Sequence, residues 1–332
     1  MNTRIRKIDL VSMSRSALAR AGLPPTDADT VITHLLEEEL MGKASHGFFR
    51  LPGIVKVIRD SHTTCEPFTE RETGFSALIN GARHLGLVVA QIACNVTAEK
   101  AILYGIAIVG MTNYAGTTGA MGYFTRQLAK RNLIGIALCT SEYAVAPWGG
   151  RDPILGTNPI SIAIPTVEAP VVVDFSTAAR TYGELMLAAK DGKRIPEGIV
   201  LDSQGMPSTD PNDANNGCQL PMGEHKGYGL GLAIEVLAGT FVGSKAGKSA
   251  VVGPDGMLFL AFRPDLFVNP SQFVDNTERL LEEIRHSSLA YGFTAIRIPG
   301  EASWKAYEMN RAKPDIEIND DVLQEIKRLA AE

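Results

Sequence analysis

The chain has 332 residues, of which 45% are hydrophobic and 21% are charged. This length predicts roughly two domains. The apolar fraction is ample for a packed core, which excludes a disordered or collagen-like chain. The formal net charge of −5 leaves no domain-wide basic excess. Nucleic acid is therefore not an expected partner, because sequence-independent binding to phosphates needs such an excess.

Four cysteines lie far apart, with no CxxC pair and no Cys/His cluster: Cys65, Cys94, Cys139 and Cys218. The spacing supports neither a metal site nor a dense disulfide framework. Reduced, mostly buried thiols are expected instead, as in a cytoplasmic protein. No apolar segment follows the polar first six residues, and no apolar run reaches the roughly 18 residues of a membrane span. We therefore expect a cytoplasmic protein with no membrane partner.

Two helices are predicted in the first 45 residues, at 8–21 and from Thr26 to about Met41. Gly22 ends the first helix, and two prolines follow it. Thr26 with Asp29 three residues later resembles a capping box. The run of three glutamates at 37–39 is interpreted as a solvated edge of the second helix.

From residue 84 onward, short runs rich in Ile and Val alternate with helical patterns. Such runs between helices are typical of buried strands in an α/β sheet. Strands are predicted at 106–111, 134–139, 160–164, 171–175 and 257–262. Helices are predicted at 85–104, 119–131, 182–190, 226–241 and 272–288, followed by two short helical segments. The Gly- and Pro-rich stretches 147–159 and 192–223 are predicted to be ordered loops.

Several nucleotide and hydrolase motifs are absent. The nearest candidates for a G-x-G-x-x-G fingerprint, residues 116–122 and 227–231, lack its spacing, so a standard Rossmann domain is not supported. Residues 243–249 resemble a Walker A loop but are one residue short and follow a helix. They are interpreted as a flexible loop, with a phosphate-handling NTPase as the alternative. There is no G-x-S-x-G elbow and no HExxH pair.

The first segment with candidate chemistry is Ser-His-Gly-Phe-Phe-Arg-Leu-Pro at 45–52. His46 can donate a proton near neutral pH to a developing alkoxide or amine. Arg50 follows four residues later, and the two side chains would share a face if the segment is helical. A guanidinium beside an imidazole suits a carboxylate next to a reducible carbonyl. The alternative is a capping histidine and a surface arginine.

Two more candidate segments are associated with predicted strands. Trp148 lies in a Pro-Trp-Gly-Gly turn, and Asn158, in Leu-Gly-Thr-Asn-Pro, can both donate to and accept from a carboxamide ring. Asp174 ends a buried strand, where ligands usually contact α/β folds. The alternatives are a structured turn at Asn158 and a helix N-cap at Asp174.

The last candidate segment opens the helix predicted at 226–241. His225 and Lys226 lie beside the free backbone N–H groups of that helix start, which favours an anion site. The alternative is a glycine-rich turn with exposed cations.

Taken in order, these segments resemble the malate/L-lactate dehydrogenase type-2 family. That family includes sulfolactate and ureidoglycolate dehydrogenases, 2,3-diketogulonate reductase, and piperideine- and pyrroline-2-carboxylate reductases. The resemblance covers nearly the whole chain as far as Arg-Ile-Pro-Gly-Glu at 297–301. Each short motif is unspecific, but the ordered set, including residues 188–198 and 223–230, is characteristic.

The resemblance implies a non-Rossmann α/β fold with a mixed sheet that binds NADH or NADPH. It also implies an intertwined homodimer whose active site lies near the subunit interface. The implied division is a helical segment at 1–75, a cofactor-binding domain at 76–300, and C-terminal helices at 301–332 that complete the helical unit. His46 matches the family's proton donor, and Arg50 matches the arginine that binds the substrate carboxylate. The cofactor-binding positions implied are Asn158, Val171, Val172, Val173, Asp174, Phe175, Ser176, His225, Lys226, Gly300, Glu301 and Ala302.

The chain departs from the family pattern at two places. Many members carry Asn-His where this chain has Asn113 and Tyr114, so Tyr114 is expected to line the active site as a neutral phenol. Members often carry Thr-Asn-Ser where this chain has Thr-Ser-Glu at 140–142. Ser141 and Glu142, together with Ser45, are therefore expected at the substrate, and Glu142 would favour an amine or imine nitrogen.

The sequence thus predicts an NAD(P)H-dependent reductase of a small 2-oxo acid or cyclic 2-imino carboxylate. In this prediction His46 supplies the proton, Arg50 binds the carboxylate, and Asn158 helps to hold the nicotinamide ring. The alternative is a non-catalytic, ligand-binding dimer derived from the same family, in which Tyr114 has replaced a required group.

Overall fold

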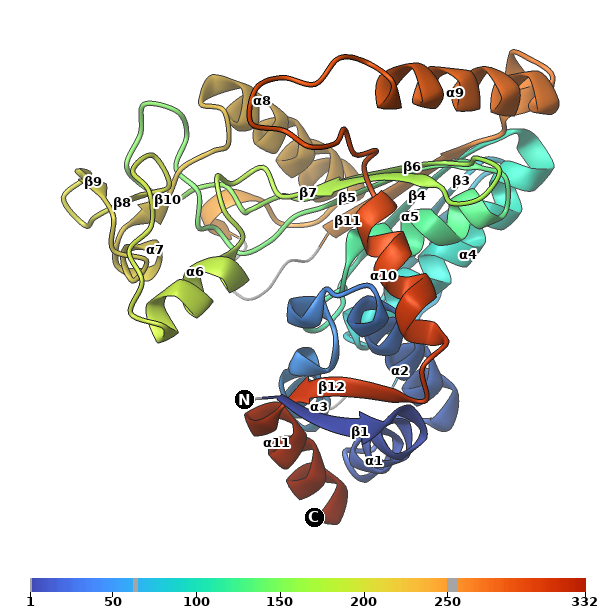
Figure 1. Ribbon diagram of the computed structural model, residues 1–332. Helices are drawn as coiled ribbons and strands as arrows, with labels where there is room; N and C mark the ends of the chain where they lie inside the picture. Colours follow the sequence, from blue (N-terminus) through green and yellow to red (C-terminus); the bar gives the residue numbers. More distant parts are fainter. Residues whose placement is uncertain (1, 62–64, 250–255) are drawn as a thin grey trace.

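The computed structural model describes residues 2–61, 65–249 and 256–332, and a seven-stranded mixed sheet forms its centre (Figure 1). The strand order is β2-β3-β4-β11-β5-β6-β7, in which only β3 and β4 are parallel. All five strands predicted from the apolar runs are present, each within one residue of its expected bounds. The bounds are β2 Phe68–Glu72, β3 Ser76–Asn80, β4 Ile106–Thr112, β5 Ile134–Cys139, β6 Ile160–Ile164, β7 Val171–Phe175 and β11 Gly256–Phe262.

Helices cover both faces of this sheet. The helices α4 (Gly86–Tyr104) and α5 (Met121–Lys130) pack on one face and enclose the largest core cluster, at whose centre Phe124 and Phe259 meet edge to face at 5.8 Å. On the other face lies α8 (His225–Ile234), which continues into a π turn, η3 (Glu235–Gly239), and a 3-10 turn, η4 (Thr240–Val242). The strands are apolar on both sides because both sides are covered.

The helical unit is built from both ends of the chain. Strand β1 (Asn2–Arg6) pairs antiparallel with β12 (Asp315–Asn319), and α1 (Lys7–Arg20) packs against α11 (Asp320–Ala331). Helices α2 (Pro25–Leu40) and α3 (Leu51–Asp60) complete its core. The β1–β12 pair was not predicted, because its residues are mostly exposed and lack an apolar run. Strand β2 belongs to the sheet, so the sheet begins within the range expected for the helical segment.

A smaller lobe and two further helices complete the fold. The lobe contains α6 (Tyr182–Lys190), α7 (Asp213–Asn216) and a three-stranded sheet of β10 (Cys218–Gln219), β8 (Val200–Leu201) and β9 (Pro207–Ser208). Short strands therefore lie in the stretch predicted to be loop. Helix α9 (Pro270–Arg285) borders the sheet, and α10 (Glu301–Arg311) runs from the sheet to the helical unit (Figure 1). Single 3-10 turns are η1 Ala44–His46, η2 Phe48–Arg50, η5 Gly247–Ser249 and η6 Pro264–Leu266.

The predicted cap at Thr26 is wrong, and so is the alternative interpretation of Asp174 as a cap. Helix α2 begins at Pro25, so Thr26 lies inside its first turn and makes no capping bond. The proline explains this, because its fixed φ and missing N–H suit the first helical position. Asp174 is not the cap of the helix that follows it, because the cap of α6 is Thr181, which forms a full capping box with Glu184.

One helix in the described residues, α4, is long and apolar enough to cross a membrane by length and composition. However, 61% of its apolar window is buried inside the protein. Its Gly86, Val89, Ala93 and Ala101 are all buried against the sheet or the helical unit. It is packed as a core helix.

Replacing Phe259 by alanine should destabilise the fold by about 3–5 kcal/mol, because a fully buried aromatic ring leaves a cavity between β11 and the two helices. Urea unfolding followed by circular dichroism measures the change. Phe267→Ala is the matched control, since that ring is 94% exposed and its loss should change stability by less than about 0.5 kcal/mol. Equal effects of the two substitutions would contradict this description of the core.

Candidate active site

The turn that carries His46 and Arg50 consists of two single 3-10 turns separated by Gly47. It does not form the continuous helix that would place both side chains on one helical face. The two residues are instead connected through Ser45, whose Oγ lies 3.1 Å from His46 Nδ1 and whose carbonyl oxygen accepts a hydrogen bond from Arg50 Nε at 2.7 Å. Within the described part of the chain, no residue is hydrogen-bonded to His46 Nε2. That nitrogen is therefore the one available for proton transfer.

The surroundings of His46 favour its neutral form. Burial and the positive charge of Arg50 lower the pKa of His46 from its ordinary value of 6.5, while the carboxylates of Glu38 and Asp174 act in the opposite direction. Burial also lowers the pKa of Arg50. An imidazole set among both signs of charge can both accept and return a proton, which suits a reversible acid–base step.

Asp174 lies near the end of β7 and joins the sheet to the helical unit. Its Oδ2 accepts a hydrogen bond from Lys43 Nζ at 3.2 Å and one from the backbone N–H of Gly122, in the first turn of α5, at 3.2 Å. A Cβ on Gly122 would lie 2.7 Å from that oxygen, so glycine is required for the close approach. The Gly-rich segment 116–122 therefore serves packing against the site and is not a dinucleotide fingerprint.

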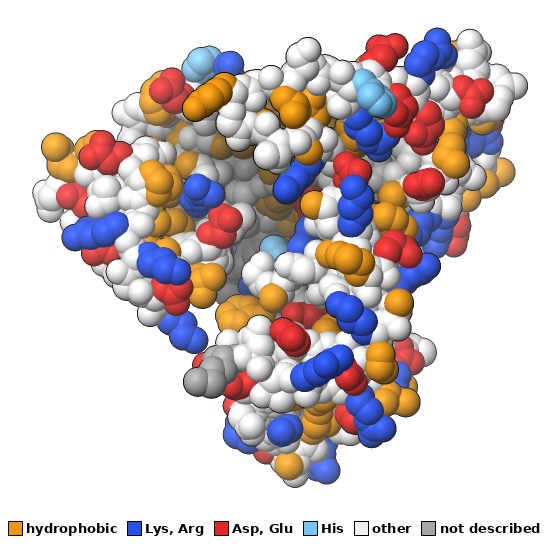
Figure 2. Space-filling model, viewed as in Figure 1, with side chains coloured by type: hydrophobic (Ala, Val, Ile, Leu, Met, Phe, Trp, Pro, Cys, Tyr) orange, Lys and Arg blue, Asp and Glu red, His pale blue; other side chains and the backbone are white. Residues whose placement is uncertain are grey.

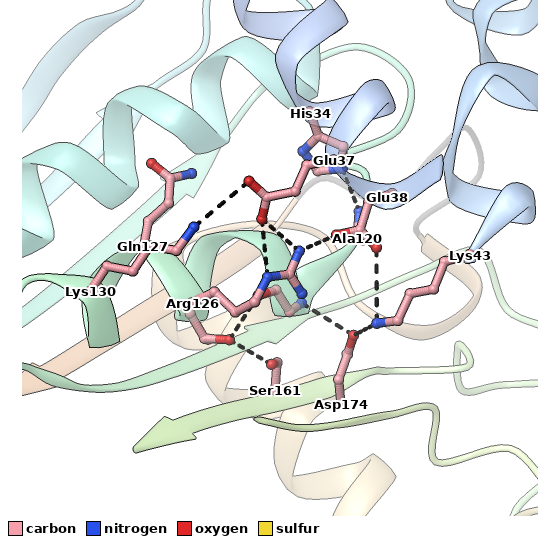
Figure 3. A network of polar contacts seen from close by, with 12 residues as sticks. His34, Glu37, Glu38, Lys43, Ala120, Arg126, Gln127, Lys130, Ser161 and Asp174 are labelled. Atoms are coloured by element: carbon pink, nitrogen blue, oxygen red, sulfur yellow. Dashed lines mark hydrogen bonds and ion pairs between the residues drawn. The ribbon is translucent and has the colours of Figure 1, made fainter. Parts of the chain in front are cut away.

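Behind Asp174, Arg126 of α5 binds the carboxylates of Glu37 and Glu38 on α2 (Figure 3). Glu38 is fully buried and Arg126 is 3% exposed. Lys43 Nζ lies 3.9 Å from the second Glu38 oxygen and so connects this pair to Asp174. The interpretation of the glutamate run as a solvated edge is wrong, because these carboxylates point inward to a guanidinium supplied by another helix.

His34, one turn earlier on α2, is a buried support for the same region. Its Nε2 accepts the Ala120 backbone N–H at 2.9 Å, and burial together with the charge of Arg126 lowers its pKa well below the ordinary value. A Cβ on Gly119 would lie 2.4 Å from His34 Nε2, and Gly119 has a φ of +81°. Sequence reasoning missed His34, Lys43, Glu38 and Arg126. The usable signal was the glycine spacing in 116–122, which marks close approaches.

A small cavity of about 130 Å³ opens beside these charges, between β7, α5 and the start of α10. Its lining combines Lys43, Arg126 and Asp174 with Gly300, Ser303 and Trp304. The surface is hollowed between the helical unit, the small lobe and the layer of α8 and α9, with Lys and Arg side chains around the hollow (Figure 2). The first turn of α6 reaches the His46 turn, since a Cβ on Gly183 would lie 3.8 Å from Ser45 Cβ.

Three of the sequence segments expected at the cofactor lie along one edge of the sheet. Strand β7 is the edge strand, and its Val172 N–H donates to the Pro299 carbonyl, next to Gly300. At its other end, Thr177 carbonyl accepts the Met222 N–H, shortly before α8 begins. His225 and Lys226 are exposed there, at the N-terminus of a ten-residue helix. The fold thus places 300–302 beside the first residues of β7 and 225–226 near its other end.

These segments fit a dinucleotide. Gly300 has a φ of +90° and approaches Val172 so closely that a Cβ would lie 3.0 Å from it, which leaves bare backbone at the start of α10. Lys226 and the first N–H groups of α8 provide positive charge for phosphate. Glu301 is held by Lys305, which lowers its pKa, and it accepts the Ile298 N–H. Ala302 is exposed, whereas Ser176 Oγ donates to the Thr157 carbonyl.

Asn158 is enclosed and does not face the hollow. Its amide donates to Glu235 Oε2 at 2.6 Å and to the Gly231 carbonyl at 3.0 Å, and the residue is fully buried. Glu235 also accepts the N–H of Gly247, at 2.7 Å. The expected contact between Asn158 and the nicotinamide ring therefore has no support. The Gly-Thr-Asn-Pro turn instead wraps a buried carboxylate on the π turn, which also anchors the loop that resembled Walker A.

Tyr114 does not line the site, and that prediction is wrong. The residue is 2% exposed and belongs to the main core cluster, with its ring against Gly86 and its hydroxyl 3.8 Å from Cys139 Sγ. Ser141 Oγ accepts the Thr157 N–H at 2.6 Å, so it organises the turn before Asn158. Glu142 is exposed next to it. Among the described residues, no three His, Cys, Asp or Glu side chains are grouped to hold a metal ion.

The chain is similar to known proteins over nearly its whole length. The family model described as malate/L-lactate dehydrogenase matches residues 5–327. The L-sulfolactate dehydrogenase of Methanothermobacter thermautotrophicus is 36% identical, with 99% of this chain and 97% of that protein covered. The (2R)-3-sulfolactate dehydrogenase (NADP(+)) of Chromohalobacter salexigens is 32% identical over 96% of each chain. The solved structure of sulfolactate dehydrogenase from Methanocaldococcus jannaschii superposes with a TM-score of 0.90 at 32% identity, covering 99% and 97%.

The mixed sheet is not a Rossmann domain, and the fold and the matched relatives place the chain in a class of dehydrogenases. The chain belongs to the malate/L-lactate dehydrogenase family. It is an NAD(P)-dependent oxidoreductase, as the sequence predicted.

Replacing Arg126 by methionine should destabilise the protein by about 3–5 kcal/mol, because Glu38 would remain buried without its partner. Chemical denaturation at pH 7 measures this loss. The triple variant Arg126→Met, Glu37→Gln, Glu38→Gln should recover part of it. Lys130→Met on the same helix is the control, since its contact with Glu37 spans 3.9 Å at a half-exposed side chain and is worth less than about 1 kcal/mol. A loss for Arg126→Met as small as the control's would show that the network does not stabilise the fold.

Proposed function

We propose that this protein interconverts a small 2-hydroxy carboxylate and its 2-oxo acid, with His46 as the group that exchanges the proton. The observation that carries the proposal is the His46 turn: a half-buried imidazole with Nε2 unpaired among the described residues, near a guanidinium and close enough to Asp174 at the sheet edge to be influenced by its charge. When bound, the nicotinamide supplies or accepts the hydride at the substrate's C2.

The residues of this chain divide the remaining work. Arg50, fixed by its bond to the Ser45 carbonyl, binds the substrate carboxylate and so orients C2. In the reducing direction His46 gives its proton to the developing alkoxide, and in the oxidising direction neutral His46 takes it back. Lys43 and Asp174 set the charge around the imidazole. Residues 171–176, 225–226 and 300–302 hold the cofactor, by the juxtaposition that the sheet edge creates.

The substrate panel follows from the carboxylate-binding arginine and from the relatives. Sulfopyruvate and oxaloacetate are the first two candidates, because several relatives are named sulfolactate or malate dehydrogenases. Cyclic 2-imino carboxylates are the second class, because exposed Glu142 offers a carboxylate to an imine nitrogen. Each should be tried with NADH and with NADPH. Cofactor binding without turnover of any substrate would instead support a non-catalytic dimer. That alternative depended on Tyr114 replacing a required group at the site, and the burial of Tyr114 in the core removes this argument for it.

His46→Ala should lower kcat for reduction by roughly 10²–10⁴-fold while the Kd of the reduced cofactor, read from nicotinamide fluorescence, stays unchanged. In the wild type, kcat for reduction should fall as pH rises through the pKa of His46, because the donor must be protonated; burial and Arg50 set that pKa below 6.5. His286→Ala is the control, since that imidazole is 78% exposed at the end of α9. Near-normal turnover of His46→Ala would remove the proton-transfer role from His46.

We further propose that the protein works in the cytoplasm as a homodimer. An uncovered groove of about 790 Å³ lies against β3 and β4, lined by apolar side chains that include Leu78, Ile108 and Val242. At its border Phe241 is 63% exposed, and Leu232, Val236 and Leu237 are also exposed. An apolar surface of this kind typically marks a protein interface.

Light scattering after size exclusion should give about twice the 35.7 kDa of one chain. Phe241→Asp should shift this mass toward that of the monomer, because a carboxylate would be buried without a partner. An unshifted monomeric mass for the wild type would overturn the dimer.

A further inference from the structure

Glu39, on the last turn of α2, occupies the space directly beneath the His46 turn. Its Oε2 accepts the backbone N–H of Phe48 at 2.9 Å. A Cβ on Gly47 would lie 2.0 Å from this oxygen and 2.9 Å from the carboxylate carbon. The glycine that follows His46 is therefore needed because the Glu39 carboxylate fills the place of a side chain.

We propose that Glu39 is a positioning residue: its carboxylate, wedged under Gly47 and bonded to Phe48, holds the turn that presents His46 and Arg50 to the substrate. The expected effect of Glu39 on activity rests on the proposed function of His46. The expected effect on the structure of the turn rests only on the contacts of Glu39 with Gly47 and Phe48. Asn310 of α10 supports the same helix end, where its Nδ2 donates to the Leu40 carbonyl at 3.0 Å.

Among the described residues, no cation forms an ion pair with the Glu39 carboxylate. Beneath it lies a cavity of about 450 Å³ bordered by Arg4 of β1, by Asp315 and Glu317 of β12, and by Lys313. Arg4 pairs with Asp315 at 3.1 Å, and Lys313 Nζ bonds Asn310 Oδ1 at 3.1 Å. On the side of the turn, the charged or titratable groups are Lys43, His46 and Arg50.

Burial of this unpaired group raises the pKa of Glu39 from 4.5 to about 7, and the Phe48 N–H acts against that rise. An ionised carboxylate is the stronger acceptor, so the turn is held more firmly above pH 7 than below it. The free energy of unfolding changes with pH in the opposite direction from the strength of this hydrogen bond. The folded chain binds more protons than the unfolded chain between pH 4.5 and about 7, so the stability contributed by this group falls as pH rises through that window.

Glu39→Gln tests the charge while keeping the size and one acceptor oxygen. We expect the Tm at pH 8 to equal or exceed that of the wild type, because a buried charge is removed. We expect kcat to fall by about 10-fold to 100-fold, since small displacements of reacting groups cost this much. In the wild type, ionisation of Glu39 should raise kcat as pH rises through about 7, and this limb of the profile should disappear in Glu39→Gln. A Tm and a kcat that fall together, with that limb retained, would indicate a merely structural residue and overturn the proposal.

Glu317→Gln is the matched control for this experiment. Glu317 borders the same cavity from β12 but is exposed, and in the described structure it makes no hydrogen bond or ion pair with the turn. We expect this variant to leave kcat, its pH profile and Tm unchanged. A loss of activity equal to that of Glu39→Gln would assign the effect to the charge of the cavity as a whole and contradict the specific role of Glu39.

A reciprocal pair of substitutions tests the fit between Glu39 and Gly47. Gly47→Ala should displace the carboxylate, and Glu39→Ala should remove it. Hydrogen–deuterium exchange of the peptide 44–51 should rise by about 10-fold to 100-fold in each single variant, which corresponds to the loss of one hydrogen bond to a charged group. The double variant should exchange no faster than Glu39→Ala alone, because the hydrogen bond is already lost and the new Cβ occupies the vacated space. Unchanged exchange in both single variants would overturn the proposal.

The exchange measurement separates this proposal from the proposed function. If His46→Ala remains active while both single variants loosen the peptide 44–51, the role of His46 fails and the positioning by Glu39 stands. If His46→Ala is inactive but the Glu39 variants keep wild-type exchange and the wild-type pH profile, the role of His46 stands and the positioning by Glu39 fails.

Discussion

One buried charge cluster determines how the two main parts of this molecule meet. The side chain of Arg126, on the sheet-covering helix α5, reaches the end of α2 and pairs there with Glu38, which is fully buried. A buried carboxylate is costly unless a cation reaches it with good geometry, so α2 can take only the position that brings Glu37 and Glu38 to this guanidinium. Lys43 then extends the cluster to Asp174 on the sheet edge. The location of the His46 turn follows from this arrangement.

Most of the regular structure could be predicted from the sequence because both faces of the sheet are covered. Strands buried on two sides are continuous apolar runs, which is why 134–139, 160–164 and 171–175 coincide with the observed strands. The structure also confirms the long predicted helices, among them α4 and α9. The β1–β12 pair and the lobe strands escaped prediction, since they are short or exposed and depend on partners distant in sequence.

The candidate site was harder to predict, because its residues come from separate elements. The His46 turn and the three segments expected at the cofactor carried recognisable motifs, and the fold brings the latter to one edge of the sheet. The partners of these groups carried none. Three consecutive glutamates resemble a solvated edge, and only the tertiary position of Arg126 turns Glu38 inward. Asn158 and Tyr114 were assigned from motif position alone, and burial shows that the first holds a turn and the second fills the core.

The pairing of β1 with β12 has a consequence for synthesis of the chain. Helices α1 and α3, which support the His46 turn, pack against α11, whose last residue is Ala331. Domains generally fold as units while the chain emerges from the ribosome. The sheet can therefore assemble during translation, whereas the unit bearing the imidazole also needs β12 and α11, which follow the last strand of the sheet in the sequence. The turn that carries His46 therefore gains its full support only after all seven strands of the sheet have been synthesised.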